Sequence, residues 1–211
     1  MARKIGAVIL AAGAGMRLGG VAKALLGTAN GETFLERIVG TVSPYAPCGA
    51  EPLGITSPEG RINQRLLVVV GPPHGREVAA LASDLGLHVV HNPQPERGMA
   101  SSIALGFTAM AETDCDAAWL WPVDHPEVAP ATLAALVAAL GDHDAARPTV
   151  GGRGGHPPLV ARALWPRLAG CASLPNGARD VFASADVIDV PVADRGCVRD
   201  IDTVLDLEVV R

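Results

Sequence analysis

The sequence contains few aromatic residues, no long run of one charge sign and no long apolar stretch. No uninterrupted apolar run reaches the about 18 residues of a membrane helix, and the opening segment runs into glycines, which predict a folded turn rather than a cleaved signal. The 17 basic and 22 acidic residues give a net charge of -5, which argues against nucleic acid and membrane surfaces as partners. We therefore expect a cytoplasmic protein.

Cysteine and lysine are also scarce. The four cysteines lie far apart and lack the close pairs that structural zinc or a redox motif needs, so we expect reduced thiols at Cys48, Cys115, Cys171 and Cys197. Lys4 and Lys23 are the only lysines in a chain that otherwise uses arginine as its basic residue. Because Lys23 lies in a glycine-rich segment, it is a candidate ligand-binding residue.

The length of 211 residues fits one α/β domain over residues 1–211. Strand-like runs are expected at Ile5–Leu10, Leu66–Val70, His88–His91, Ala117–Trp121, Pro158–Arg162 and Val187–Val192. Helical spacing is expected at Thr33–Val42, Glu77–Leu85, Met99–Ala111, Pro130–Leu140, Arg179–Ala185 and after Asp202. The segment Ser43–Arg65 is rich in proline and glycine and predicts a loop insertion at 43–65, and Thr149–His156 is too rich in glycine for regular structure.

This alternation predicts the fold class. Strands that alternate with helices favour an α/β fold, a three-layer α/β/α sandwich with a mostly parallel, Rossmann-like twisted sheet. In such sheets, ligands bind beyond the carboxyl ends of the strands. Functional residues are therefore sought after the predicted strands.

A glycine-rich segment follows the first predicted strand, from Leu10 to Lys23, with the sequence LAAGAGMRLGGVAK. Small residues let backbone amides approach a ligand closely, and Arg17 and Lys23 supply positive charge where phosphate oxygens would collect. The segment therefore predicts a phosphate-binding loop.

Alternative roles for this segment differ in how well they fit its spacing. A dinucleotide fingerprint wants glycine where this chain has Leu18, although the glycines fit a looser variant, and no convincing acidic residue follows the second strand. A Walker-type loop is excluded because Lys23 lies between Ala22 and Ala24. The remaining alternative is a tight strand-to-helix turn with two solvated basic side chains.

Acidic residues follow two later segments. Asp124 comes directly after an apolar strand, and Asp200 and Asp202 lie near the end of the chain. Magnesium prefers one or two carboxylates together with phosphate oxygens and water, so these residues are candidate ligands. The alternatives are that Asp124 ends a strand through turn hydrogen bonds and that Asp202 or Thr203 caps a helix.

A third group of polar residues includes Ser101 and Ser102, which begin a predicted helix where free amides can receive an anion or a base edge. Plain N-capping is the alternative for either serine. Arg153 and His156 lie in a basic glycine-rich loop, which is either a substrate contact or a solvated turn.

Taken in order, the motifs resemble those of the MobA-like nucleotidyltransferases, in particular the branch of the molybdenum cofactor cytidylyltransferases. The resemblance begins with LAAGxGxRxGG and the following lysine. It continues through Asn92–Ser102, Pro122–Pro126, Gly155–Pro158, Gly177–Arg179 and Asp200–Thr203. Each motif is short, but their ordered set spans nearly the whole chain and identifies the family more specifically than any one of them.

The resemblance implies a nucleotide-diphospho-sugar transferase type of fold, a nucleoside triphosphate and a phosphorylated acceptor as partners, and Mg²⁺ as cofactor. It implies catalytic roles for Lys23, Arg17 and Asp124 and metal binding by Asp124 and Asp202. Nucleotide binding is implied for Leu10, Ala11, Ala12, Gly13, Gly15, Arg17, Lys23, Ser101 and Ser102. Acceptor binding is expected of His125, Arg153 and His156.

The expected reaction moves a nucleotidyl group onto an acceptor phosphate and releases pyrophosphate. The LAAG form favours CTP over GTP, and the branch implies the molybdenum cofactor as acceptor and a molybdoenzyme as the partner that receives it. Alternatives are a sugar phosphate or another phosphorylated metabolite as acceptor, and a non-catalytic accessory protein. The chain departs from relatives at Pro95, where they often have tryptophan, and at His125, where Gln or Met is more usual.

Overall fold

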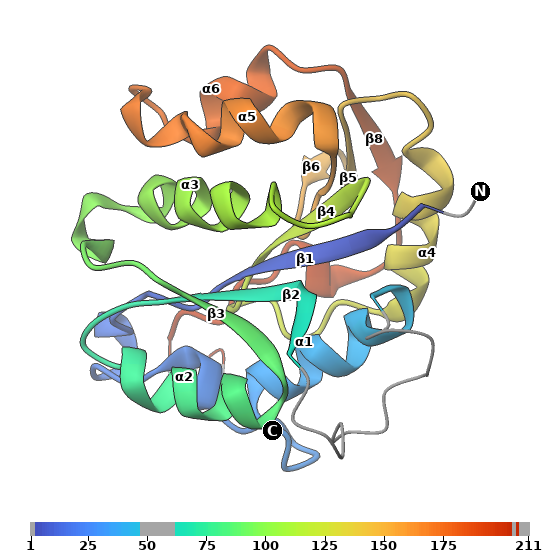
Figure 1. The fold of residues 1–211 in the computed structure, drawn as a ribbon. Coiled ribbons are helices and arrows are strands. Elements are labelled where there is room, and N and C mark those ends of the chain that lie inside the picture. Colours follow the sequence, from blue (N-terminus) through green and yellow to red (C-terminus); the bar gives the residue numbers. More distant parts are fainter. Residues whose placement is uncertain (1–2, 47–61, 204–205, 207–211) are drawn as a thin grey trace.

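The computed structural model describes residues 3–46, 62–203 and 206, with the side chain of Arg17 excepted. In this part of the chain, eight strands form one mixed sheet (Figure 1). They are β1 (Ile5–Leu10), β2 (Asn63–Val70), β3 (Leu87–His91), β4 (Ala117–Pro122), β5 (Ala145–Val150), β6 (Arg153–Gly154), β7 (Leu159–Ala161) and β8 (Val187–Pro191). Their order is β3-β2-β1-β4-β7-β5-β6, and β8 pairs with β5.

Most strand pairs are parallel. β1 pairs in parallel with both β2 and β4, β2 with β3, and β5 with β8, whereas β7 is antiparallel to β4 and β5 and β6 is antiparallel to β5. β1 is central and completely buried. At its carboxyl end, Leu10 is in register with Val69 of β2 and Pro122 of β4. The residues that follow β1 and β4 therefore emerge side by side.

Helices cover both faces of the sheet (Figure 1). One face packs against α1 (Phe34–Val42), α2 (Gly75–Asp84) and α4 (Pro130–Ala139). The other packs against α3 (Met99–Met110), α5 (Trp165–Ala169) and α6 (Ala178–Ala183). Short 3-10 turns are η1 (Met16–Leu18), η2 (Lys23–Leu25), η3 (Ser43–Tyr45), η4 (Pro95–Arg97), η5 (Arg162–Leu164), η6 (Cys171–Ser173) and η7 (Arg195–Cys197). This arrangement confirms the predicted three-layer α/β/α fold with a mostly parallel sheet.

The two apolar layers explain why these elements form. Trp119 and Trp121 of β4 point into the layer beneath α1 and α4, while Phe107 and Trp165 fill the layer beneath α3 and α5. Alternate residues of β1 serve both layers, because neighbouring side chains in a strand point to opposite faces. None of the helices in the described ranges is long and apolar enough to cross a membrane.

Several boundaries differ from the sequence-based expectation. β5 and α5 were not predicted, and the segment Thr149–His156 that was expected to be irregular contains the end of β5 and all of β6. Pro148 lies inside β5, and proline inside a run argues against a strand. β2 begins at Asn63 and η3 occupies Ser43–Tyr45, so regular structure lies within the bounds predicted for the insertion 43–65. Residues 47–61 of that insertion, Cys48, and nearly all of the helix predicted after Asp202 lie outside the described residues.

Candidate active site

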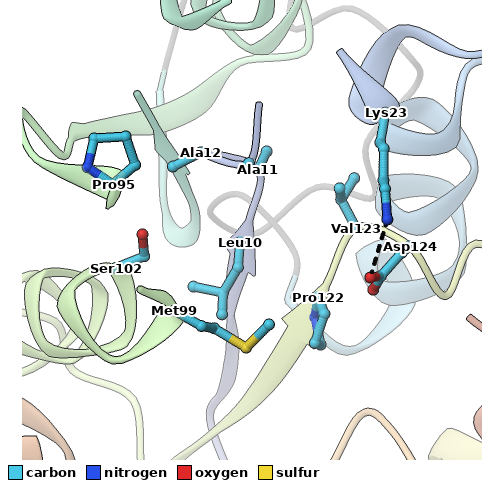
Figure 2. Close-up of a pocket in the computed structure, with 11 residues that line it drawn as sticks. Leu10, Ala11, Ala12, Lys23, Pro95, Met99, Ser102, Pro122, Val123 and Asp124 are labelled. Atoms are coloured by element: carbon cyan, nitrogen blue, oxygen red, sulfur yellow. Dashed lines mark hydrogen bonds and ion pairs between the residues drawn. The ribbon is translucent and has the colours of Figure 1, made fainter. Parts of the chain in front are cut away.

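A pocket of about 240 Å³ opens at the carboxyl ends of β1 and β4 (Figure 2). In the sheet order, β1 lies between β2 and β4, where the strand order reverses, and this is the usual ligand position in open α/β sheets. The lining combines the LAAG segment with residues from η2, η4, the start of α3 and the end of β4 with its following loop: Leu10, Ala11, Ala12, Gly13, Lys23, Pro95, Met99, Ser102, Pro122, Val123 and Asp124.

The LAAG segment forms one wall of this pocket through its backbone. Ala11 and Ala12 are buried, and the amide of Ala11 donates to the carbonyl of Val69 at 2.8 Å, which extends the β1–β2 pairing one residue past the strand. Gly13 is exposed, and a Cβ atom built there would meet nothing within 4 Å. Small residues leave this backbone accessible to a ligand.

Gly15 folds the loop that follows. Its carbonyl accepts hydrogen bonds from Leu18 N at 2.9 Å and Gly20 N at 3.0 Å. Its φ of 59° is left-handed, and a Cβ atom at this position would collide with the Val21 carbonyl. Glycine is therefore required here for the turn, and Gly15 does not line the pocket. The backbone of Arg17 lies in η1, and its side chain lies outside the described part of the chain.

Lys23 lies between two carboxylates at the edge of the pocket. Its Nζ atom is 3.4 Å from Asp124 Oδ2 and also forms an ion pair with Asp202 Oδ1. All three side chains are mostly shielded from solvent, with exposures of 16%, 21% and 26% for Lys23, Asp124 and Asp202. Figure 2 shows Lys23 reaching from η2 toward the loop after β4. Asp124 lies 101 positions after Lys23 in the sequence and Asp202 lies 179 positions after it, yet both carboxylates meet the lysine.

Asp124 has unused acceptor capacity. Asp124 Oδ1 is buried and has no hydrogen-bond partner, which is costly for a carboxylate oxygen unless a cation or ligand meets it. Two nearby carboxylates match the small protein ligand set that Mg²⁺ uses beside phosphate oxygens. Within the described residues, no group of three or more His, Cys, Asp or Glu side chains is placed to hold a metal ion by itself.

The two serines at the start of α3 both accept a hydrogen bond from Asn92 Nδ2 at 2.9 Å, but they differ in their contact with the pocket. Ser101 donates its hydroxyl to Gly98 O at 2.7 Å, as a turn residue does, and does not line the pocket. Ser102 lines the pocket, and its oxygen accepts from Asn92 Nδ2 at 2.9 Å. Asn92, which is 2% exposed, was not predicted as a site residue. Its Oδ1 accepts from Gln94 N at 2.9 Å, which forms a turn. An asparagine directly after a strand favours such a turn, so this was the signal in the sequence that could have pointed to Asn92.

Apolar residues of the pocket were also missed. Met99 is 56% exposed at the start of α3 and lies just below Leu10 in Figure 2, with Pro95 above Ser102. Pro122 and Val123 complete the wall on the β4 side. An exposed methionine rarely signals a site in a sequence, because only the fold shows that it borders a cavity. Met99 gives the pocket a polarizable, adaptable edge.

His125 and His156 form a pair next to Asp124, with His125 Nε2 3.8 Å from Asp124 Oδ1. Their ring centroids are 5.0 Å apart, and His125 Nδ1 lies 3.2 Å from Gly196 O. Burial, and secondarily the neighbouring His125, lower the pKa of His156 to about 4 against the opposing effect of Asp124 and Asp200. His156 is therefore neutral at pH 7. Arg153 is exposed in β6, and neither it nor the two histidines line the pocket.

Residues 7–189 match the MobA-like NTP transferase domain. Because this match covers most of its length, the chain belongs to that nucleotidyltransferase family. No curated protein sequence gives a significant match.

Solved structures share the fold at low identity. Rv0371c from Mycobacterium tuberculosis is 24% identical with a TM-score of 0.71, and the alignment covers 99% of this chain and 98% of that one. A nucleotidyl transferase from Methanothermobacter is 23% identical with a TM-score of 0.72, covering 98% and 96%. Molybdopterin-guanine dinucleotide biosynthesis protein A from Archaeoglobus fulgidus is 15% identical with a TM-score of 0.65, covering 98% and 95%. Rv0371c has also been solved in complex with manganese, at 21% identity and a TM-score of 0.63, covering 98% and 97%.

Proposed function

We propose that this protein is a cytoplasmic, Mg²⁺-dependent enzyme that transfers CMP from CTP to a phosphorylated acceptor, most specifically the molybdenum cofactor, and releases pyrophosphate. The observation that carries the proposal is the ion-paired group of Lys23, Asp124 and Asp202 beside the pocket that the LAAG segment lines. A basic side chain and two carboxylates beside an accessible backbone are the parts that nucleotidyl transfer needs.

The pocket suits the base and sugar of the nucleotide. The small residues Ala11, Ala12 and Gly13 leave backbone groups within reach of a base edge. Ser102 adds a hydroxyl whose oxygen is already oriented by Asn92, so its hydrogen is available to a ligand acceptor. Met99 and Leu10 provide apolar surface for the faces of a planar ring. A base in this position directs the triphosphate toward Lys23.

The cation would be held by Asp124 and Asp202. The buried Oδ1 of Asp124 has no hydrogen-bond partner and is available as a ligand. When bound, Mg²⁺ supplies charge neutralisation for the phosphate oxygens. The ammonium of Lys23 already bridges the two carboxylates, so its release to the phosphates accompanies nucleotide binding. The manganese complex of Rv0371c supports the choice of a divalent cation.

In the reaction, an oxygen of the acceptor phosphate forms a bond to the α-phosphorus of CTP. The bond from that phosphorus to the bridging oxygen of the β-phosphate breaks, and the electron pair leaves with pyrophosphate. An acceptor phosphate is an anion at neutral pH, so no strong general base is required. Lys23, together with Arg17, stabilises the charge of the leaving group. His125 and the neutral His156 contribute hydrogen bonds on the acceptor side, where Arg153 is the nearby exposed cation of β6.

Pyrophosphate release tests the proposal directly. The purified protein is incubated with Mg²⁺, each of the four nucleotides and a panel of phosphorylated acceptors that includes molybdenum-loaded pterin and sugar phosphates. Release with CTP and the pterin alone supports the proposal, and a molybdoenzyme is then the expected recipient of the product. Release only with a sugar phosphate reassigns the acceptor. Release with no combination contradicts catalysis and favours an accessory role.

A further inference from the structure

The carboxylate of Asp194 links two segments that are far apart in the sequence. α4 begins a few residues after Asp124, and its N-cap residue, Ala129, has no side-chain capping bond. Asp194 Oδ2 provides that cap, because it accepts from Ala129 N at 2.8 Å and from Thr132 Oγ1 at 2.7 Å. A negative charge at the start of a helix also interacts favourably with the helix dipole. Asp194 thus fixes the end of the loop that carries Asp124 and His125.

The same carboxylate begins the segment that leads to Asp202, residues 194–202, here called the strap. Asp194 Oδ1 accepts from Gly196 N at 3.0 Å and so caps η7. A Cβ atom at Gly196 would lie 2.5 Å from Glu127 O, so the strap passes against the loop after β4 with no room for a side chain. Asp194 Oδ1 therefore binds the strap, and Oδ2 binds the start of α4 and also accepts from Cys197 Sγ of the strap at 3.5 Å.

The strap in turn holds three residues of the acceptor half, including Asp124 itself. Gly196 O pairs with His125 Nδ1 at 3.2 Å, and Cys197 O accepts from His156 N at 2.7 Å. Ile201 N donates to Asp124 O at 2.9 Å. A carbonyl oxygen only accepts, so His125 carries a hydrogen on Nδ1. The strap therefore fixes both the orientation and the tautomer of His125.

We infer that Asp194 is the positioning residue of the acceptor half of the site. The expected change in the KM of the acceptor rests on the proposed function, whereas the expected change in the tautomer of His125 does not. Asp194 contacts neither the pocket nor Lys23, and it acts through the backbone of the strap and the first turn of α4. The pocket for the base is built on β1 and α3, which the strap does not hold, whereas the strap carries Asp202 and holds Asp124, which would bind the cation. Loss of Asp194 should therefore weaken the use of the acceptor and leave the binding of CTP without Mg²⁺ in place.

The kinetic test compares Asp194→Asn with Asp114→Asn. Asp114 is the matched control because it also accepts several hydrogen bonds, from Lys4 and Arg65, at the opposite, amino-terminal edge of the sheet. For Asp194→Asn we expect the KM of the molybdenum-loaded pterin to rise about tenfold or more, the scale of losing an outer-shell partner. The Kd of CTP measured by calorimetry without Mg²⁺ should stay within about twofold, and the control should leave both values unchanged. An unchanged acceptor KM, or an equal loss of CTP affinity, overturns the inference.

A second readout does not require turnover. Long-range ¹H–¹⁵N spectra of the histidine rings report which nitrogen carries the hydrogen. In the wild type and in Asp114→Asn, His125 should be the Nδ1–H tautomer, and in Asp194→Asn the two tautomers should mix. A single Nδ1–H tautomer in Asp194→Asn overturns the inference. If the wild type releases no pyrophosphate with any acceptor, the proposed function fails while this result still decides the role of Asp194.

Thr132→Val keeps the test decisive if Asp194→Asn does not fold. This variant removes one of the bonds to Asp194 Oδ2 and keeps the backbone bond from Ala129. We expect a smaller effect than in Asp194→Asn, in the same direction. The KM of the acceptor should rise about threefold, because only one of the hydrogen bonds to Asp194 is lost. A Thr132→Val protein with wild-type acceptor KM and an unmixed His125 tautomer would count against the role of Asp194.

Discussion

The two halves of the candidate site are built in different ways. The nucleotide half combines one continuous stretch, residues 10–23, whose shape is set by the end of β1 and by glycine turns, with Met99 and Ser102 at the start of α3. The acceptor half comes from three separate segments, around residues 124–129, 153–156 and 194–202, which are joined by bonds such as His125 Nδ1 to Gly196 O. Local backbone geometry makes the first half, and long-range polar contacts make the second.

This difference teaches where each half is sensitive to substitution. In the first half, a change acts on the residue itself or on the turn that contains it. In the second half, a change at Asp194 acts on residues that it does not touch. Lys23, Asp124 and Asp202 lie at the junction of the halves, since the lysine belongs to the first and both acids are held by the second.

Substitutions in the group of Lys23, Asp124 and Asp202 should have the largest effect on turnover. Lys23→Ala removes the ammonium that meets both carboxylates, and Asp124→Ala removes the proposed metal ligand. We expect either variant to reduce turnover by about two or more orders of magnitude, as loss of one electrostatic stabiliser does. Pyrophosphate release measures this, with thermal unfolding to establish that the variants are folded. Near-normal turnover in a folded variant would remove the catalytic role.

Asp202→Asn should separate cation binding from the rest of the junction. The amide keeps the shape of the side chain but is a poorer ligand for a hard cation. We expect the Mn²⁺ or Mg²⁺ concentration for half-maximal activity to rise about tenfold or more, with less change in rate at saturating cation. The measurement is a cation titration of pyrophosphate release. An unchanged half-maximal concentration would leave Asp124 as the ligand and assign Asp202 to holding Lys23.

Gly15→Ala tests whether the nucleotide half depends on local backbone geometry. The left-handed φ of 59° and the collision with the Val21 carbonyl predict a loss of about 1–3 kcal/mol in the free energy of unfolding. Gly40→Ala is the matched control, because Gly40 lies in α1 with nothing within 4 Å of where a Cβ atom would lie, and this change should stabilise the protein by about 0.5–1 kcal/mol. Urea unfolding measures both. Equal effects of the two substitutions would contradict the assigned role of Gly15.

The smallest effect is expected at the edge of the sheet away from both halves. Hydrogen bonds from Arg65 and then Lys4 hold the pKa of the Asp114 carboxyl well below its usual range. The ionised Asp114 carboxylate thus makes its full contribution to the free energy of unfolding at pH values above its unfolded pKa of about 4. This contribution is lost as the pH falls below that value. Because the group is 54% exposed, we expect about 0.2–1 kcal/mol, as for surface ion pairs. Urea unfolding from pH 7 to pH 3 should show a smaller loss in Asp114→Asn than in the wild type. A parallel pH profile would show that the ion pairs contribute nothing to stability.

The accuracy of the sequence-based prediction follows the same division. β1 was predicted with its observed bounds because a short apolar run that ends in glycines has few alternatives. β5 was missed because Arg147 and Pro148 interrupt its apolar pattern, and only pairing with β7 and β8 makes it a strand. Ser101 shows why the sequence alone could not predict every site residue. A serine at the start of a helix is compatible with both a turn hydrogen bond and a ligand contact.

The sequence by itself determined the α/β alternation, the glycine-rich loop after β1 and the set of charged residues from which the site is made. These features depend on local torsional preferences and on the burial of apolar runs, which neighbouring residues specify. Only the tertiary structure decided that Lys23 meets Asp124 and Asp202, that Asn92 orients Ser102, and that Asp194 caps a distant helix. Those contacts join residues separated by long stretches of chain, and their geometry exists only once the sheet has brought the strand ends together.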